Sequence, residues 1–210
     1  MLVALNDIAK EQKNPTNTTM KKVKNLNYVS SHHEAIVTDH ASDLILKCHS
    51  DASYISKLKA RIRSGGHFLL SENNKTPKKN GAVLNIDQII KVVIMSGAEA
   101  QIEAMYINAC ESIIDRISLI VMRNPQPRLP MQMDNSAVHS VVTNNIHTII
   151  TNAMDMQLQW LRCQYDQGHL RYYWRPGKHN LAKYWKKYDL ASHHRENRYK
   201  VFTPTCQLEL

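Results

Sequence analysis

The chain has 210 residues, four of them cysteine, and a formal net charge of +9. This length suits one domain with a hydrophobic core and a smaller appendage, and no apolar stretch approaches the ~20 residues that a membrane span needs. The basic charge favours an anionic partner, with nucleic acid ahead of a membrane surface, and the isolated cysteines lack the C-x-x-C pairing of zinc or redox motifs.

The first 40 residues favour a separate helical piece. Residues 4–29 are polar and compatible with helix, with a break around Pro15. The opening MLVALNDIAKEQ acquires acid and polar groups too early for a secretory signal, so we expect an intracellular protein. We divide the chain into this segment (1–40), a domain (41–190) and an irregular basic tail (191–210).

Strand signals dominate the region that follows. Residues 44–50, 66–71 and 81–86 read as strands, and residues 89–95 are a candidate to continue the sheet. Together they predict three or four successive antiparallel strands. From Ala98 to Val121, apolar residues such as Ile102, Met105 and Ala109 recur at helical spacing, which predicts a helix over one face of the sheet.

The second half alternates short strands with helices. Residues 131–133 and 169–174 read as strands, whereas residues 136–142 and 153–165 have helical patterns, and a last basic helix begins near Asn180. This order of elements predicts an α/β fold.

Three acidic residues occupy positions suited to a shared site. Asp51 and Asp134 follow apolar runs, and Glu99 opens the long helical segment. Clustered carboxylates at one rim of a fold bind divalent metal and support phosphodiester chemistry. Each acid also has a purely structural interpretation: Asp51 as an Asx-turn residue closing a strand, Glu99 as half of a capping box with Ser96, and Asp134 as an N-cap.

The segment after residue 170 is rich in basic residues interleaved with aromatic ones. Basic groups neutralise phosphates and aromatics pack on sugars or bases. The candidate nucleic-acid-binding residues are Arg171, Arg175, Lys178, Lys186 and Lys187. The alternative is a solvated charged face whose aromatic residues belong to the core.

Several ordered motifs resemble the ribonuclease H domain of copia-type LTR retrotransposon polyproteins. They are HSDASY (49–54), SGGHFL (64–69), SGAEAQ (96–101), MDNSA (133–137), NAMDM (152–156) and YYWRPG (172–177). The resemblance covers roughly residues 40–190, and the preceding segment is similar to the end of the reverse transcriptase. Any one motif would be weak evidence, but their order and spacing make the resemblance specific.

The resemblance implies a ribonuclease H-like fold, with a mixed five-stranded sheet flanked by helices and a helical N-terminal extension. It implies hydrolysis of the RNA strand of RNA–DNA hybrids with two Mg²⁺ ions, for which Mn²⁺ can substitute. Asp51 would bridge both ions, and Glu99 and Asp134 would each help to hold one. The reverse transcriptase of the parent polyprotein would be a further partner, and His179 would have an auxiliary role near product release.

One departure bears directly on activity. Where the family carries an Asn-Leu-Ala-Asp type pattern, this chain has Asn180, Leu181, Ala182 and Lys183. An ammonium about 6 Å from a divalent ion would repel it by on the order of 5 kcal/mol at an effective dielectric near 20. We therefore expect a nuclease impaired by Lys183. The alternatives are a catalytically inactive nucleic-acid-binding relic and a genomic fossil whose product has no function.

Overall fold

A computed structural model describes most of the predicted domain and parts of both flanking segments. The described residues are 8–9, 11–31, 35–37, 43–54, 62–73, 80–143, 152–186 and 202–204. The predicted nucleic-acid-binding residue Lys187 lies outside them, and of Lys186 only the backbone is described.

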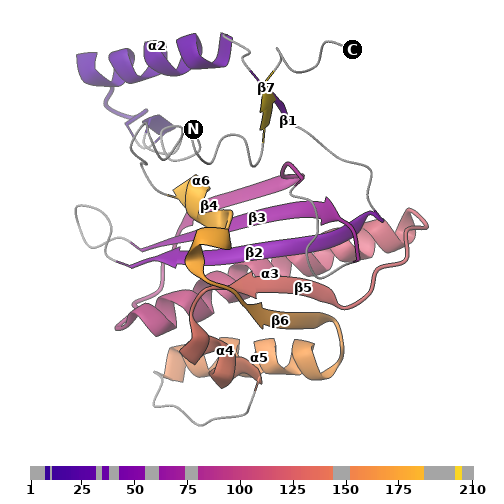
Figure 1. Cartoon of the computed structure of the whole chain (residues 1–210). Coiled ribbons are helices and arrows are strands. Elements are labelled where there is room, and N and C mark those ends of the chain that lie inside the picture. The colour runs from indigo at the N-terminus through magenta and orange to yellow at the C-terminus, as the bar shows by residue number, and fades with distance from the viewer. Residues whose placement is uncertain are drawn as a thin grey trace.

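A mixed five-stranded sheet forms the centre of the domain (Figure 1), with the strand order β4-β3-β2-β5-β6. The strands are β2 (Ile45–Ser53), β3 (Arg63–Ser71), β4 (Leu84–Ile89), β5 (Leu129–Met133) and β6 (Leu170–Trp174). The first three pair antiparallel, whereas β5 runs parallel to both β2 and β6. The predicted α/β fold with a mixed five-stranded sheet is confirmed.

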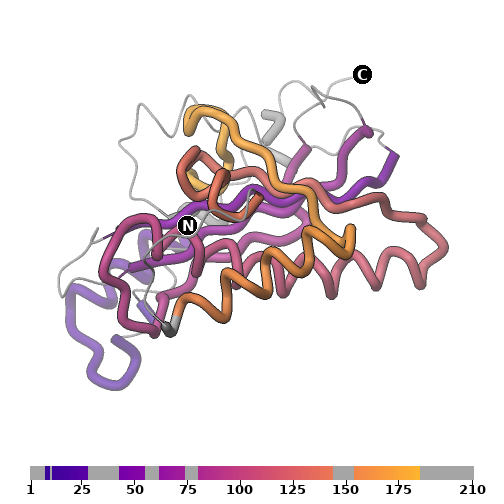
Figure 2. Tube along the Cα trace, turned by 90° about the horizontal axis from the view of Figure 1, so that it is seen from below, coloured from indigo at the N-terminus to yellow at the C-terminus, as the bar shows by residue number. Residues whose placement is uncertain are grey.

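Helices cover both faces of this sheet. The helices are α3 (Gly97–Val121), α4 (Ser136–Thr143), α5 (Asn152–Asp166) and α6 (Ala182–Lys186), with a short 3-10 helix η1 (Gly177–His179) before the last. Figure 2 shows the strands between α3 and α5 on one side and α6 on the other. Since β2 is central and covered on both faces, it is buried along nearly its whole length.

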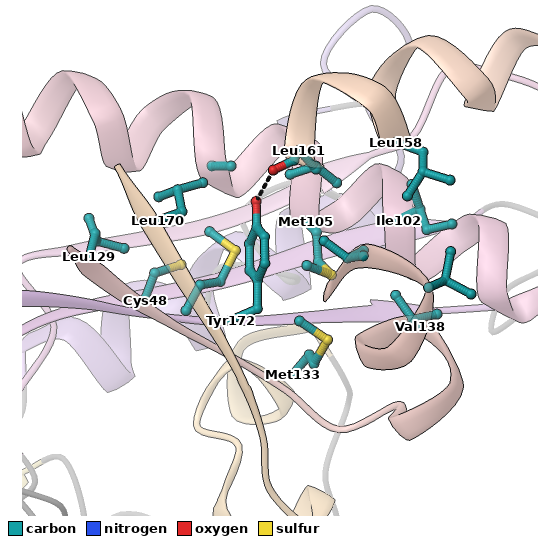
Figure 3. Packing of buried hydrophobic residues seen from close by; sticks show 14 of the residues in the cluster. Cys48, Ile102, Met105, Leu129, Met133, Val138, Leu158, Leu161, Leu170 and Tyr172 are labelled. Carbon is teal, nitrogen blue, oxygen red and sulfur yellow. Dashed lines mark hydrogen bonds between the residues drawn. The ribbon is translucent and has the colours of Figure 1, made fainter. Parts of the chain in front are cut away.

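The main hydrophobic core lies between the sheet and the helices α3, α4 and α5 (Figure 3). Met105 of α3, Val138 of α4 and Leu161 of α5 meet the strand residues there. Tyr172 of β6 belongs to this core, and its hydroxyl donates a 3.0 Å hydrogen bond to the Leu161 carbonyl. Burial of the phenol raises its pKa. Tyr172 therefore follows the alternative interpretation of the basic segment, in which aromatic residues pack in the core.

The prediction that residues 89–95 continue the sheet is wrong beyond Ile89, which ends β4. Residues 90–95 read as a strand because they include the run Val92, Val93, Ile94 and Met95. However, β4 is an edge strand, and the side chain of Val93 is 85% exposed. Strand propensity depends on having a packed, paired environment, which this segment lacks.

The two flanking segments meet in a small sheet. Helix α2 (Asn17–Ser31) begins just after Pro15, as expected from the predicted break. Strand β1 (Ala35–Val37) then pairs antiparallel with β7 (Phe202–Pro204). The tail predicted as irregular thus contains a short strand, because pairing with a distant segment supplies backbone partners that local sequence does not reveal. No helix in the described part of the chain is long and apolar enough to cross a membrane.

Candidate functional site

Two of the predicted acids lie in or directly after neighbouring strands. In the parallel pair of β2 and β5, Cys48 is level with Met131 and His49 with Gln132. Continuing this register places Asp51 level with Asp134, which directly follows β5. Adjacent strands lie about 4.8 Å apart, so the backbone brings both acids to the same end of the sheet.

Asp51 lies inside β2 and does not close it. It is opposite Gly65 in β3, and the antiparallel pairing continues to Ser53. The alternative in which Asp51 forms an Asx turn at the strand end is therefore wrong. The side chain faces away from α3, because Ser50 faces that helix and accepts a 2.9 Å hydrogen bond from Asn108. Asp51 is buried, with an exposed fraction of 3%.

The predicted capping role of Asp134 belongs instead to its neighbour. The side-chain oxygen of Asn135 accepts hydrogen bonds from the backbone N–H groups of Ala137 (3.1 Å) and Val138 (3.2 Å), which caps α4. The N-cap interpretation of Asp134 is therefore wrong. The Asp134 carbonyl accepts a 3.0 Å hydrogen bond from the indole of Trp174, and its carboxylate is left to interact elsewhere.

Glu99 is engaged at the start of its own helix. The hydroxyl of Ser96, the N-cap residue, accepts a 3.2 Å hydrogen bond from the Glu99 N–H. The Glu99 carboxylate in turn accepts a 2.7 Å hydrogen bond from the Met95 N–H. This is close to a capping box, with the carboxylate reaching one residue further back than usual. The structural interpretation of Glu99 is thus confirmed by its contacts.

Lys183 lies directly against the acidic strand end. Its Nζ atom is 2.6 Å from Asp134 Oδ2, and the two side chains are 32% and 16% exposed. Gly177 makes room for this ion pair, since a Cβ there would overlap Lys183 Nζ and lie 2.9 Å from Asp134 Oδ2. The residue that departs from the family pattern therefore contacts one of the acids that the pattern would serve.

Two residues missed by the sequence interpretation fix the position of Lys183. The side-chain amide of Asn180 donates a 2.8 Å hydrogen bond to the Ser50 carbonyl, and its oxygen accepts one from the Ala182 N–H. The Leu181 N–H donates to His49 Nδ1 at 3.2 Å. These contacts attach the start of α6 to β2 beside Asp51. The only sequence signal for them was the Asn-Leu-Ala run before Lys183.

The α6 side of the sheet carries a buried polar layer. Arg63 and Asp87 form a paired ion contact at 2.6 and 2.5 Å, with both side chains almost fully buried. His67 lies level with His49 and Asn85, and its Nδ1 is 3.0 Å from the Asn85 side-chain oxygen. Asp87 is level with Gly65, beside Asp51, but its charge is balanced by Arg63. It is therefore no substitute for the acid that the Asn-Leu-Ala-Asp pattern has where this chain has Lys183.

Positive charge gathers toward the β6 edge of the sheet. The sheet register places Lys47 of β2 level with Pro130 and Arg171. Burial, followed by repulsion from Arg171 and Arg175, lowers the pKa of the Lys47 ammonium. The mutual repulsion shows that these cations share one electrostatic neighbourhood along the β6 edge.

The remaining basic candidates lie on the surface near this edge. Arg171, Lys178 and His179 are exposed, and Arg175 is half-buried. Trp174, between two of these cations in sequence, is 46% exposed. The aromatic residues of this segment are therefore divided between the core and the surface, and the core interpretation holds for Tyr172 but not for Trp174.

The acids do not form a metal-binding set as they are arranged. Within the described ranges, no group of three or more His, Cys, Asp or Glu side chains could hold a metal ion. Asp134 is paired with an ammonium, and the Glu99 carboxylate accepts a backbone hydrogen bond. The donor set present does not fit two divalent ions.

No protein-family model matches this sequence, and no curated protein matches it. Solved structures do resemble the fold. LC11 ribonuclease H1, isolated from compost by a metagenomic approach, aligns over 68% of this chain and 92% of its own, with a TM-score of 0.50 and 10% identity. The structure of LC11 ribonuclease H1 in complex with an RNA/DNA hybrid aligns over 65% of this chain and 88% of its own, with a TM-score of 0.45 and 8% identity. An N-terminal ribonuclease H domain from Mycobacterium tuberculosis, solved as a fusion with maltose binding protein, aligns over 65% of this chain and 86% of its own. Its TM-score is 0.43 and the identity is 14%.

The first of these alignments covers nearly all of the compared domain and agrees with the mixed sheet described above. The chain therefore has a ribonuclease H-like fold.

Proposed function

We propose that this chain is a ribonuclease H-like domain of copia-type retrotransposon origin that binds RNA–DNA hybrids and whose cleavage of the RNA strand is impaired by Lys183. The observation that carries this proposal is the 2.6 Å contact between Lys183 Nζ and Asp134 Oδ2, at a strand end shared with Asp51. Three of the carboxylates that would support metal-assisted hydrolysis are retained in sequence, but one of them is neutralised by Lys183, which stands where the pattern has another acid.

Hybrid binding is supported by the distribution of charge. Arg171, Arg175 and Lys178 follow one edge of the sheet and its connection to α6, on the side where the acids lie. Phosphate contacts from such a row supply sequence-independent affinity. We include Lys186 and Lys187 in this surface from the sequence pattern alone. His179, exposed in η1, keeps its proposed auxiliary role.

The wider assignment follows from the sequence resemblance. We propose that residues 41–190 are the ribonuclease H-like unit, that residues 1–40 derive from the end of a reverse transcriptase, and that residues 191–210 are an appended basic tail. The polymerase part of the parent polyprotein would be the protein partner, and the setting would be intracellular.

A catalytically inactive nucleic-acid-binding relic is the second candidate. It is favoured by the engagement of Glu99, whose carboxylate binds the Met95 N–H and so serves its own helix. In that case an acid at position 183 would not restore cleavage, because Glu99 would serve its helix and not a metal ion.

One experiment separates these functions. A labelled RNA–DNA hybrid is mixed with the purified chain, Lys183→Asp and Asp51→Asn, and binding in EDTA and cleavage in Mg²⁺ or Mn²⁺ are measured separately. Weak cleavage that rises in Lys183→Asp and vanishes in Asp51→Asn supports the impaired nuclease. Salt-sensitive binding with no cleavage by any variant supports the relic. A chain that does not bind the hybrid contradicts both.

A further inference from the structure

We infer that the Lys183 ammonium takes the place of a divalent cation as the balancing charge at the strand end of Asp51 and Asp134. The strand end is therefore folded and electrostatically balanced without bound Mg²⁺ or Mn²⁺. The inference rests on the proposed function, because it concerns the same acids. It goes further because it assigns Lys183 a stabilising role as an internal cation, and does not treat this position only as the loss of a metal ligand.

The first argument is electrostatic. Continuing the parallel register of β2 and β5 places Asp51 level with Asp134, which directly follows β5, and two carboxylates at such neighbouring positions repel each other. A cation offsets that repulsion, and in this chain it is supplied by Nζ of Lys183 at 2.6 Å from Asp134 Oδ2. A divalent ion approaching Asp134 would meet a positive charge already bound to the oxygen it needs.

The second argument is positional. A lysine on a solvated face swings freely into water, but the backbone before Lys183 is fixed. Asn180 and Leu181, both buried, hydrogen-bond to Ser50 and His49 of β2, and the Lys183 N–H donates to the Asn180 carbonyl at 3.3 Å. The ammonium is therefore held near the acids by the same contacts that attach α6 to the sheet.

The third argument is the fit of the surroundings. Gly177 passes so close to the ion pair that any side chain there would displace it. Of the other acids, Asp87 on this side of the sheet is neutralised by Arg63, and Glu99 Oε2 accepts a hydrogen bond from the Met95 N–H. The close approach of Gly177 and the carboxylate of Asp134 thus suit a compact internal cation.

The test is a titration of the 210-residue chain with Mn²⁺. Binding is measured as the loss of the free-ion signal in electron paramagnetic resonance. Lys183→Met removes the charge at similar length, and Lys183→Arg keeps the charge as a matched control. We expect weak Mn²⁺ binding by the unmodified chain and by Lys183→Arg, and a gain of about tenfold or more in Mn²⁺ affinity in Lys183→Met, accompanied by a rise in Tm on adding Mn²⁺.

A second variant guards against misfolding of the first. Gly177→Ala leaves Lys183 in place but pushes its ammonium away from Asp134, so it should gain Mn²⁺ binding in part. Circular dichroism checks that each variant is folded. Equal Mn²⁺ affinity in the unmodified chain and Lys183→Met overturns the inference, as does the absence of Mn²⁺ binding in both folded variants. Hybrid binding in EDTA is measured on the same samples, so failure of the proposed function is seen independently.

Discussion

The side-chain amide of Asn180 donates a 2.8 Å hydrogen bond to the carbonyl of Ser50, and this contact joins the start of α6 to the central strand of the sheet. Asn180 is buried, and its side-chain oxygen also accepts from the Ala182 N–H. A single amide therefore satisfies backbone groups on two elements that lie far apart in sequence.

We expect Asn180→Ala to lower the free energy of unfolding by about 1–3 kcal/mol, because it leaves buried backbone groups unsatisfied. Urea denaturation measures this. The exposed neighbour Lys178 provides the control, since Lys178→Ala should change stability by no more than about 0.5 kcal/mol. Equal effects of the two substitutions would show that the amide contact does not stabilise the docking of α6.

Two glycines should respond in opposite directions to the same added methyl group. A Cβ at Gly66 would overlap Asn108 Oδ1 and lie 2.8 Å from Phe68 Cε2, whereas a Cβ at Gly97 would meet nothing within 4 Å. We expect Gly66→Ala to destabilise by about 1–3 kcal/mol through overpacking. Gly97→Ala, in the first turn of α3, should stabilise by up to about 1 kcal/mol through helix propensity. Thermal unfolding of both variants checks the contrast, and a common sign would contradict it.

His67 makes stability depend on pH. Burial lowers the pKa of this imidazole from 6.5 to about 4, against the opposing effect of its hydrogen bond with Asn85. Above pH 6.5 it is neutral in both the folded and unfolded states. Between pH 6.5 and 4 the unfolded chain binds a proton that the folded chain does not, so the free energy of unfolding falls as the pH falls, by up to about 3 kcal/mol.

Comparing chemical denaturation at about pH 7.5 and about pH 4.5 in the unmodified chain and in His67→Gln isolates this contribution from that of the carboxyl groups. The variant should lose less stability on acidification than the unmodified chain. If both lose the same amount, the His67 imidazole does not have a depressed pKa.

Arg171 and Arg175 should contribute to hybrid binding through phosphate contacts. Each Arg→Ala substitution is expected to weaken binding and to reduce the slope of log affinity against log salt by about 0.7–0.9. Fluorescence anisotropy across a salt series gives both values. Lys91 is the matched control, because it is exposed just after β4, at the other edge of the sheet. A Lys91→Ala effect as large as those of the arginines would remove the case for a directed binding surface.

The helices and central strands could be predicted because their signals are local. The helix Gly97–Val121 follows apolar spacing, and its start at Ser96 and Glu99 follows the capping pattern. Asp51 and Asp134 were expected at one rim of the fold because both follow apolar runs, and the register of β2 and β5 places them at one end of the sheet.

Features that depend on distant partners could not be read in the same way. Arg63 enters β3 only because Asp87 neutralises it in the interior, so the sequence interpretation began that strand at Gly66. The contact of Lys183 with Asp134 depends on how η1 and α6 lie over the sheet, which no local pattern encodes. The strand propensity of residues 92–95 was genuine but had no partner strand to realise it.

The arrangement of strands also has a consequence for the order of folding. β2, β3 and β4 pair with their neighbours in sequence. In contrast, β5 pairs with β2, from which it is separated along the chain by β3, β4 and α3. Contacts between nearby segments form sooner than contacts that close long loops. In pulse-labelling hydrogen exchange, we expect amides of β3 and β4 to become protected before those of β5. A partly folded chain with only β2, β3 and β4 in place would then possess a sheet but would not yet bring Asp51 and Asp134 together.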